Sequence, residues 1–168
     1  MRTILKAALL CALAAGGSAA AAPNIQGIAC PGEDVRIVVL GDSLADGLWG
    51  ALYRALGACD RAQVVRGTRV SDGLVKTDAA SWAIRVNGEA DLVVVQMGAN
   101  DITNIRDGRT RLVYGSPAWR DAYEARAREL AGALKEKADR VIWMGLPVVG
   151  QTKYEPEYRE ISALQAEA

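Results

Sequence analysis

A serine stands where an apolar run gives way to a helix-like pattern in the segment VRIVVLGDSLADGL, residues 35–48. A serine at the start of a helix commonly caps it by accepting a hydrogen bond from a backbone N–H group. The same position suits a nucleophile, because the serine's own N–H lies at the positive end of the helix dipole and can stabilise an oxyanion that forms beside the hydroxyl. Ser43 is therefore a cap or a nucleophile, and on its own the segment favours the cap.

An asparagine follows a second apolar run in DLVVVQMGAND, residues 91–101. Asn100 can donate hydrogen bonds from its side-chain amide, or it can simply close a turn. In a parallel sheet, binding and chemistry collect at the carboxyl ends of the strands. If both runs are strands of such a sheet, we expect Asn100 and Ser43 to face the same crevice.

Apolar runs and amphipathic stretches alternate along the rest of the chain. The runs predict strands at residues 35–40, 62–68, 91–98 and 140–149, and the stretches predict helices at residues 44–58, 78–88, 118–138 and 154–168. This alternation predicts one α/β domain over residues 23–168, a doubly wound, flavodoxin-like parallel sheet with helices on both faces.

Two further features concern the packing of this domain. The helix at 118–138 has an apolar stripe at steps of four and three, formed by Trp119, Tyr123, Ala127, Leu130 and Leu134. The tryptophans Trp82, Trp119 and Trp143 are expected in the core rather than on a sugar-binding surface. Residues 106–111, RDGRTR, are expected to form a solvated loop, which could also border a substrate cleft.

Two motifs in this order resemble one known family. Gly41-Asp42-Ser43-Leu44 resembles the first block of the SGNH (GDSL) hydrolases, and Gly98-Ala99-Asn100-Asp101 resembles their third block. Their second block is a glycine after the second strand, for which Gly67 and Gly73 are candidates. Gly73 is the better match, since the stretch SDGL around it is similar to an exported, poorly characterised branch of the family.

The resemblance implies a serine ester hydrolase that works through an acyl-serine intermediate without a metal or an organic cofactor. Ser43 would be the nucleophile, and the N–H groups of Ser43 and Gly73 with the side chain of Asn100 would form the oxyanion hole. Asp101 would anchor its loop and Asp42 would hold the first turn. The implied substrates are O-acyl groups of envelope carbohydrates, lipids or small esters.

One element of the family pattern is missing from this sequence. The family's fourth block, Asp-x-x-His, supplies the base that a serine hydroxyl needs, and the chain has no histidine. The sequence also ends inside a helical pattern, so we expect a fragment that lacks its last strand and the histidine block. The alternatives are a non-catalytic carbohydrate-binding module of the envelope, and an O-acyltransferase with the same serine.

The first 22 residues, MRTILKAALLCALAAGGSAAAA, predict a secretory signal peptide. Their apolar run is shorter than the roughly 20 residues that a membrane-spanning helix needs. Removing them leaves 18 basic and 20 acidic residues. No basic stripe or cationic tail then remains in the sequence, so we expect no nucleic-acid partner and no stable membrane span. We expect it in the periplasm or secreted, with an oligomeric state that the sequence does not indicate.

Export to an oxidising compartment would also allow the cysteines to form a disulfide. Cys11 leaves with the signal segment, and Cys30 and Cys59 remain as a pair in an oxidising compartment. Cys30 precedes the first predicted strand and Cys59 follows the first predicted helix, which places both at the same edge of the sheet. We therefore expect a Cys30–Cys59 disulfide; the alternative is two buried free thiols.

Overall fold

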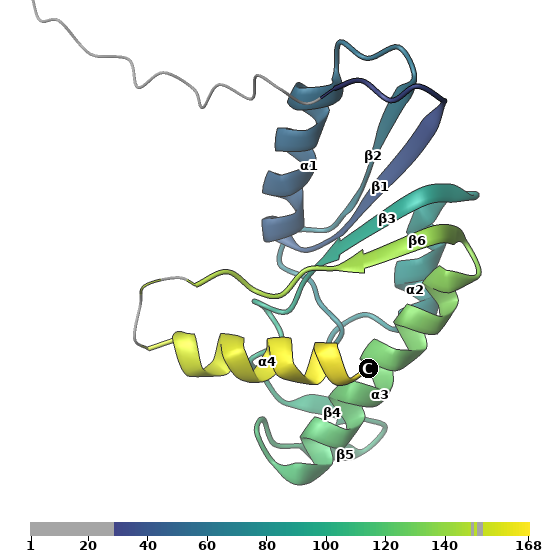
Figure 1. The fold of residues 1–168 in the computed structure, drawn as a ribbon. Coiled ribbons are helices and arrows are strands. Elements are labelled where there is room, and N and C mark those ends of the chain that lie inside the picture. Colours follow the sequence, from purple (N-terminus) through teal and green to yellow (C-terminus); the bar gives the residue numbers. More distant parts are fainter. Residues whose placement is uncertain (1–28, 149, 151–152) are drawn as a thin grey trace, which may run out of the picture.

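The computed structural model describes residues 29–148, 150 and 153–168 of the chain (Figure 1). The predicted signal segment, residues 1–22, lies outside the described residues. Within the part that is described, no helix has the length and apolar character needed to cross a bilayer.

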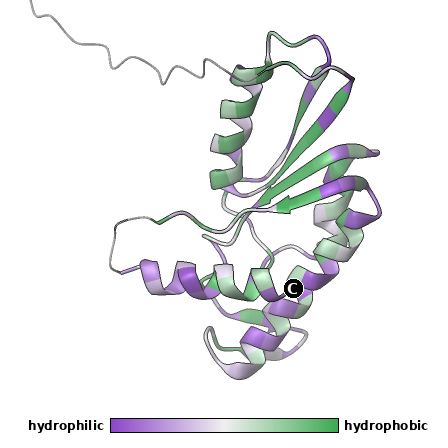
Figure 2. Cartoon of the chain, in the orientation of Figure 1, coloured by the Kyte–Doolittle hydropathy of each residue, from purple (hydrophilic) through white to green (hydrophobic). Residues whose placement is uncertain are grey.

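A parallel sheet of four strands carries the fold, in the order β2-β1-β3-β6. The strands are β1 (Val35–Gly41), β2 (Ala62–Thr68), β3 (Ala90–Gln96) and β6 (Ala138–Trp143). Strand β1 pairs with β2 on one side and β3 on the other, and its four residues from Val38 to Gly41 are all buried. Such a strand must be apolar on both faces, and Figure 2 shows β1 and β3 as largely hydrophobic.

Helices cover both faces of this sheet (Figure 1). Helix α1 (Ser43–Leu56) packs through Leu56 against Ile37 and Val94. The helices α2 (Ala79–Ala83) and α3 (Pro117–Lys135) lie on the opposite face. They pack against the strand residues whose side chains point to that face, which alternate along each strand with those that point toward α1. Helix α4 (Glu155–Glu167) lies against α3. The predicted α/β class with a parallel sheet and helices on both faces is confirmed.

The apolar stripe of α3 is buried as predicted, at Trp119, Tyr123, Ala127, Leu130 and Leu134. Of the three tryptophans expected in the core, Trp82 and Trp119 are fully buried. Trp143 is only partly buried, because it lies on β6, the last strand of the described sheet. Its indole Nε1 is nevertheless buried without a hydrogen-bond partner among the described residues.

Three predicted elements differ from the structure. The helix expected at 78–88 ends at Ala83 and continues as one 3₁₀ turn, Ile84–Val86, which stops where Asn87 adopts a φ of 50°. The strand expected to reach residue 149 ends at Trp143, because its partner β3 ends at Gln96. The loop expected at 106–111 is instead an antiparallel hairpin of β4 (Ile105–Asp107) and β5 (Thr110–Leu112), which turns at Gly108 with a φ of 57°.

The predicted disulfide is confirmed. Cys30 and Cys59 are bonded, with a Cα–Cα distance of 5.4 Å and a sequence separation of 29 residues. The bond ties the segment before β1 to the turn between α1 and β2, where Cys59 also packs with Leu56 and Ile37. It lies at the amino-terminal edge of the sheet, away from Ser43 at the other end of β1.

Removing this bond is expected to lower stability and leave the fold intact. Closure of a loop of this length stabilises a folded protein by about 3–4 kcal/mol in the chain-entropy account. Urea unfolding of the Cys30→Ser/Cys59→Ser double variant should show a loss of that size. Dithiothreitol should lower the stability of the parent protein to the same value. A reductant that leaves the urea midpoint of the parent unchanged would contradict the disulfide.

Candidate active site

Three turns meet at the carboxyl-terminal edge of the sheet. In the register of the strands, Gly41 of β1 lies beside Thr68 of β2 and Gln96 of β3. The turns that follow these strands therefore start at the same level. They contain Ser43, Gly73 and Asn100 respectively, so the fold brings the three predicted site residues to one edge.

Asp42, and not Ser43, caps helix α1. The Asp42 carboxylate accepts a hydrogen bond from the N–H of Leu44 through Oδ1 at 2.8 Å, from an extended backbone conformation. Ser43 is the first residue of the helix and is exposed. Its hydroxyl has no hydrogen-bond partner in the described part of the chain. The capping role that the sequence left open thus belongs to its neighbour.

The other oxygen of Asp42 joins the first turn to the third. Oδ2 lies 3.2 Å from the N–H of Gly98 and 3.4 Å from the side-chain Nδ2 of Asn100. Burial raises the pKa of the Asp42 carboxyl above its ordinary value, and hydrogen bonds from Leu44, Gly98, Ala99 and Asn100 oppose that rise. The Asn100 amide is thereby held next to the residue that precedes Ser43.

Asp101 joins the third turn to the second. Its fully buried carboxylate accepts hydrogen bonds from the N–H groups of Leu74 at 3.1 Å and Val75 at 3.0 Å. A third comes from the hydroxyl of Tyr123 at 3.0 Å. Burial is the largest influence on the pKa of Asp101 and raises it, the three hydrogen bonds lower it, and the nearby Asp42 adds to the rise.

Gly73 lies directly over this carboxylate. A Cβ atom at Gly73 would come within 2.1 Å of Oδ1 of Asp101, so only glycine allows the loop to approach so closely. Asn100 reaches the same loop, because its Nδ2 donates to the carbonyl oxygen of Asp72 at 3.1 Å. Gly67, the other candidate, lies inside β2, where its missing Cβ faces Leu40. The contacts of Gly73 with the third turn therefore favour it over Gly67.

Helix α4 packs against Gly98 in the third turn. Gly98 has a φ of 130°, and a Cβ there would lie 2.6 Å from Cγ2 of Ile161 in α4. Burial, together with the nearby Asp42 carboxylate, raises the pKa of the Tyr158 phenol, which belongs to the same helix. Helix α4 is thus part of the site's surroundings, which the motifs did not indicate.

Sequence reasoning missed the polar groups beneath the site. Tyr123 was assigned to an apolar stripe and Gln165 was given no role, yet both are buried and hydrogen-bonded to each other at 2.9 Å. A tyrosine at an apolar position carries no signal that its hydroxyl has a partner. Gln165 lies in a helix that shows no motif.

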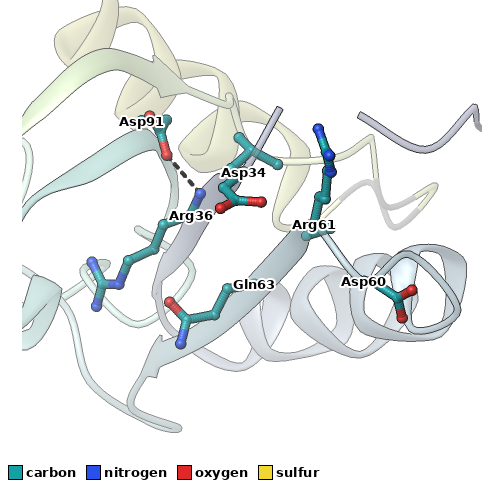
Figure 3. A pocket seen from close by; sticks show the side chains of 8 residues that line it. Asp34, Arg36, Asp60, Arg61, Gln63 and Asp91 are labelled. Carbon is teal, nitrogen blue, oxygen red and sulfur yellow. Dashed lines mark hydrogen bonds between the residues drawn. The ribbon is translucent and has the colours of Figure 1, made fainter. Parts of the chain in front are cut away.

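A hollow lies at the amino-terminal edge of the sheet, opposite the edge that carries Ser43 (Figure 3). It measures about 280 Å³ and contains side chains of both charges. The guanidinium of Arg36 donates to the carbonyls of Val86, Asn87 and Glu89, and that of Arg61 donates to Gly32. Both guanidinium groups thus donate to loop carbonyls. Among the described residues, no group of three or more His, Cys, Asp or Glu is arranged to hold a metal.

Comparison with known proteins identifies the family. The family model of DUF459, described as a protein of unknown function, matches residues 36–168. The chain belongs to DUF459, a family associated with SGNH-like hydrolases, and the resemblance that the motifs indicated is confirmed. No curated protein sequence matches the chain.

Two solved structures share the fold. One is LAE5, an alpha/beta hydrolase enzyme from the metagenome of Lake Arreo, Spain, with 18% identity and a TM-score of 0.60 over 80% of this chain and 72% of that one. The other is the lipase/acylhydrolase from Enterococcus faecalis, with 17% identity and a TM-score of 0.53 over 79% of this chain and 70% of that one. At 18% and 17% identity, the likeness to these two structures shows a shared fold and nothing more.

A side chain at Gly73 is expected to disturb the second turn. The Gly73→Ala variant must move either the loop or Asp101, at a cost of about 1–3 kcal/mol for overpacking a filled site. The matched control is Gly132→Ala in α3, where an added Cβ meets nothing within 4 Å. That change should stabilise the helix by up to about 1 kcal/mol. Equal urea midpoints for Gly73→Ala and the parent protein would contradict the contact.

Proposed function

We propose that this chain is the core of a serine ester hydrolase with Ser43 as its nucleophile. One observation carries the proposal: an exposed, unpartnered serine hydroxyl at a helix start beside a held asparagine amide. A serine that only capped the helix would have its hydroxyl occupied, and here Asp42 does that work.

The proposed reaction begins with attack of Ser43 Oγ on the carbonyl carbon of an ester. The hydroxyl proton passes to a base, and the carbonyl oxygen becomes an oxyanion. The N–H of Ser43, at the first position of α1, has no acceptor within the helix and is available to that oxyanion. The other proposed donors are the N–H of Gly73, which here donates to Oδ1 of Asp72 at 2.8 Å, and the Nδ2 of Asn100, which here donates to Asp42 and to the carbonyl of Asp72. Each would exchange such an acceptor for the oxyanion. The base then protonates the departing alcohol, and water releases the acyl group by the same steps in reverse.

We expect the base to come from outside the described residues. The sequence has no histidine. The ammonium of Lys76 donates to the carbonyl of Ser71 at 2.6 Å, and that of Lys153 lies over the ring of Tyr154. The raised pKa of Tyr158 keeps its proton on the phenol. We propose that a histidine of an Asp-x-x-His segment, beyond residue 168 in the whole protein, supplies the base.

The proposed substrate is an O-acyl group on an envelope carbohydrate, or a lipid or small ester. Support for an exported protein comes from the basic and apolar N-terminal sequence and from the Cys30–Cys59 bond, which persists in oxidising compartments. Acyl transfer to a sugar would use the same Ser43 intermediate. Because the sequence has no histidine, a carbohydrate-binding module without turnover is the alternative from another class.

A fluorophosphonate probe tests the nucleophile. Protein expressed from the whole reading frame should be labelled at Ser43, and the Ser43→Ala variant should not be labelled. Intact-mass spectrometry and peptide mapping measure the result. Equal labelling of both proteins would reject the role of Ser43. A reading frame that ends at Ala168, or one without a downstream histidine, would reject the hydrolase and favour the binding module.

Loss of the Asn100 amide is expected to lower ester turnover in the whole protein. Removing one oxyanion donor costs about 10²–10³-fold in kcat, and Asn100→Ala should fall in that range with a nearly unchanged KM. The matched control is Asn104→Ala in the same loop, whose Oδ1 accepts from the N–H of Tyr114 and not from the site. A kcat for Asn100→Ala equal to that of the control would contradict the donor role. Product analysis with and without a sugar acceptor separates hydrolysis from transfer.

A further inference from the structure

A chain of buried hydrogen bonds runs from α4 to the loop that carries Gly73. The side-chain Nε2 of Gln165 donates to the carbonyl of Met97 at 2.8 Å and to the hydroxyl of Tyr123 at 2.9 Å. The Tyr123 hydroxyl lies 3.0 Å from Oδ2 of Asp101. Tyr123 and Asp101 are fully buried and Gln165 is 6% exposed, so water does not compete for these groups.

The direction of every donor in this chain is determined. A backbone carbonyl only accepts, so the NH₂ group of Gln165 must face Met97. The same NH₂ group then supplies the hydrogen to the oxygen of Tyr123. The phenol must therefore use its own hydrogen on Asp101, which accepts as a carboxylate. This arrangement satisfies Met97, Tyr123 and Asp101, and it leaves the Oε1 of Gln165 buried without a hydrogen-bond partner among the described residues.

Asp101 passes this constraint to the backbone next to Gly73. Oδ2 of its carboxylate receives both the Tyr123 hydroxyl and the N–H of Leu74, and Oδ1 receives the N–H of Val75. One turn further along α3, Arg126 donates to the carbonyls of Leu74 and Val75 at 2.7 and 3.0 Å. Helix α3 thus holds the N–H groups of the loop through Tyr123 and its carbonyls through Arg126.

We propose that Tyr123 and Gln165 are positioning residues for the oxyanion-binding loop, because they fix the Asp101 carboxylate that holds the backbone at Gly73. The inference rests on the proposed ester hydrolase and extends it to two residues that touch no substrate. Helix α4, which carries Gln165, also packs closely on Gly98, where an added Cβ would lie 2.6 Å from Cγ2 of Ile161 and 3.0 Å from Nε2 of Gln165.

Hydrogen exchange tests the positioning without any need for activity. In protein from the whole reading frame, the Tyr123→Phe variant keeps the ring and its stacking on Trp119, with centroids 5.0 Å apart, and loses only the hydroxyl. The amides of Leu74 and Val75 should exchange at least about tenfold faster by NMR, as expected for a weakened buried bond. Gln165→Met should have the same local effect. Unchanged exchange at both amides would overturn the inference.

A matched control separates this effect from general loosening. Tyr114→Phe also removes a tyrosine hydroxyl bonded to α4, since Tyr114 donates to Glu160 at 3.3 Å, but it does not touch the Gly73 loop. Exchange at Leu74 and Val75 should stay at the parent value in this variant. Faster exchange there in Tyr114→Phe, equal to that in Tyr123→Phe, would reduce Tyr123 to an ordinary packing residue and overturn the inference.

Labelling kinetics at Ser43 test the link to chemistry. With a fluorophosphonate, Tyr123→Phe should lower the rate constant for covalent bond formation with Ser43 about tenfold and leave the probe's binding constant unchanged. The Tyr114→Phe variant should change neither constant. Faster amide exchange with an unchanged labelling rate would overturn the proposed effect on oxyanion binding. Absence of labelling in the parent protein would overturn the hydrolase itself, and the exchange measurement would still report on the loop.

Discussion

Asp101 has a fully buried carboxylate that accepts hydrogen bonds from two backbone amides and one phenol, and the place of Gly73 depends on it. Burying a carboxylate is costly unless such donors replace the water that it loses. Here the donors come from the loop after β2 and from α3, so the same contacts that offset burial also bring these two segments together. The absence of a side chain at Gly73 is a further condition, because any Cβ would occupy the position of the carboxylate.

Asp42, in the first turn, is likewise a buried carboxylate whose hydrogen-bond donors come from two different segments. Its Oδ1 caps α1 at Leu44, and its Oδ2 receives donors from Gly98 and Asn100. One side chain therefore starts the helix and joins the first turn to the third. Because the cap is occupied, the hydroxyl of Ser43 is left without a structural partner. Two buried aspartates thus organise the turns in which the serine, the glycine and the asparagine stand.

The sequence predicted the elements whose period is regular. The β-branched run at residues 35–40 and the stripe of α3 each match what the structure shows, since burial on both faces or on one stripe leaves a repeating pattern. The disulfide was predicted as well, because topology places Cys30 and Cys59 at one sheet edge. The hairpin at Ile105–Leu112 was missed, because its two strands have only three residues each and no apolar alternation.

The motifs predicted which residues gather at the sheet edge but not what holds them there. That Asp42 caps the helix and Ser43 does not depends on the residue at which the helix begins, because Asp42 is extended and Ser43 is already helical. Helix boundaries are not fixed to one residue by a sequence pattern. The Gln165–Tyr123–Asp101 chain joins residues 42 and 22 positions apart along the sequence, and it exists only once α4 and α3 have packed. Long-range polar contacts of this kind follow from the fold and leave no local periodicity.

The most direct test of the account is a crystal structure of the whole protein after reaction with a fluorophosphonate. We expect a bond from phosphorus to Oγ of Ser43. The phosphoryl oxygen should lie about 2.7–3.1 Å from the N–H groups of Ser43 and Gly73 and from Nδ2 of Asn100. Phosphorus on another residue, or a phosphoryl oxygen that faces away from Gly73 and Asn100, would contradict the account.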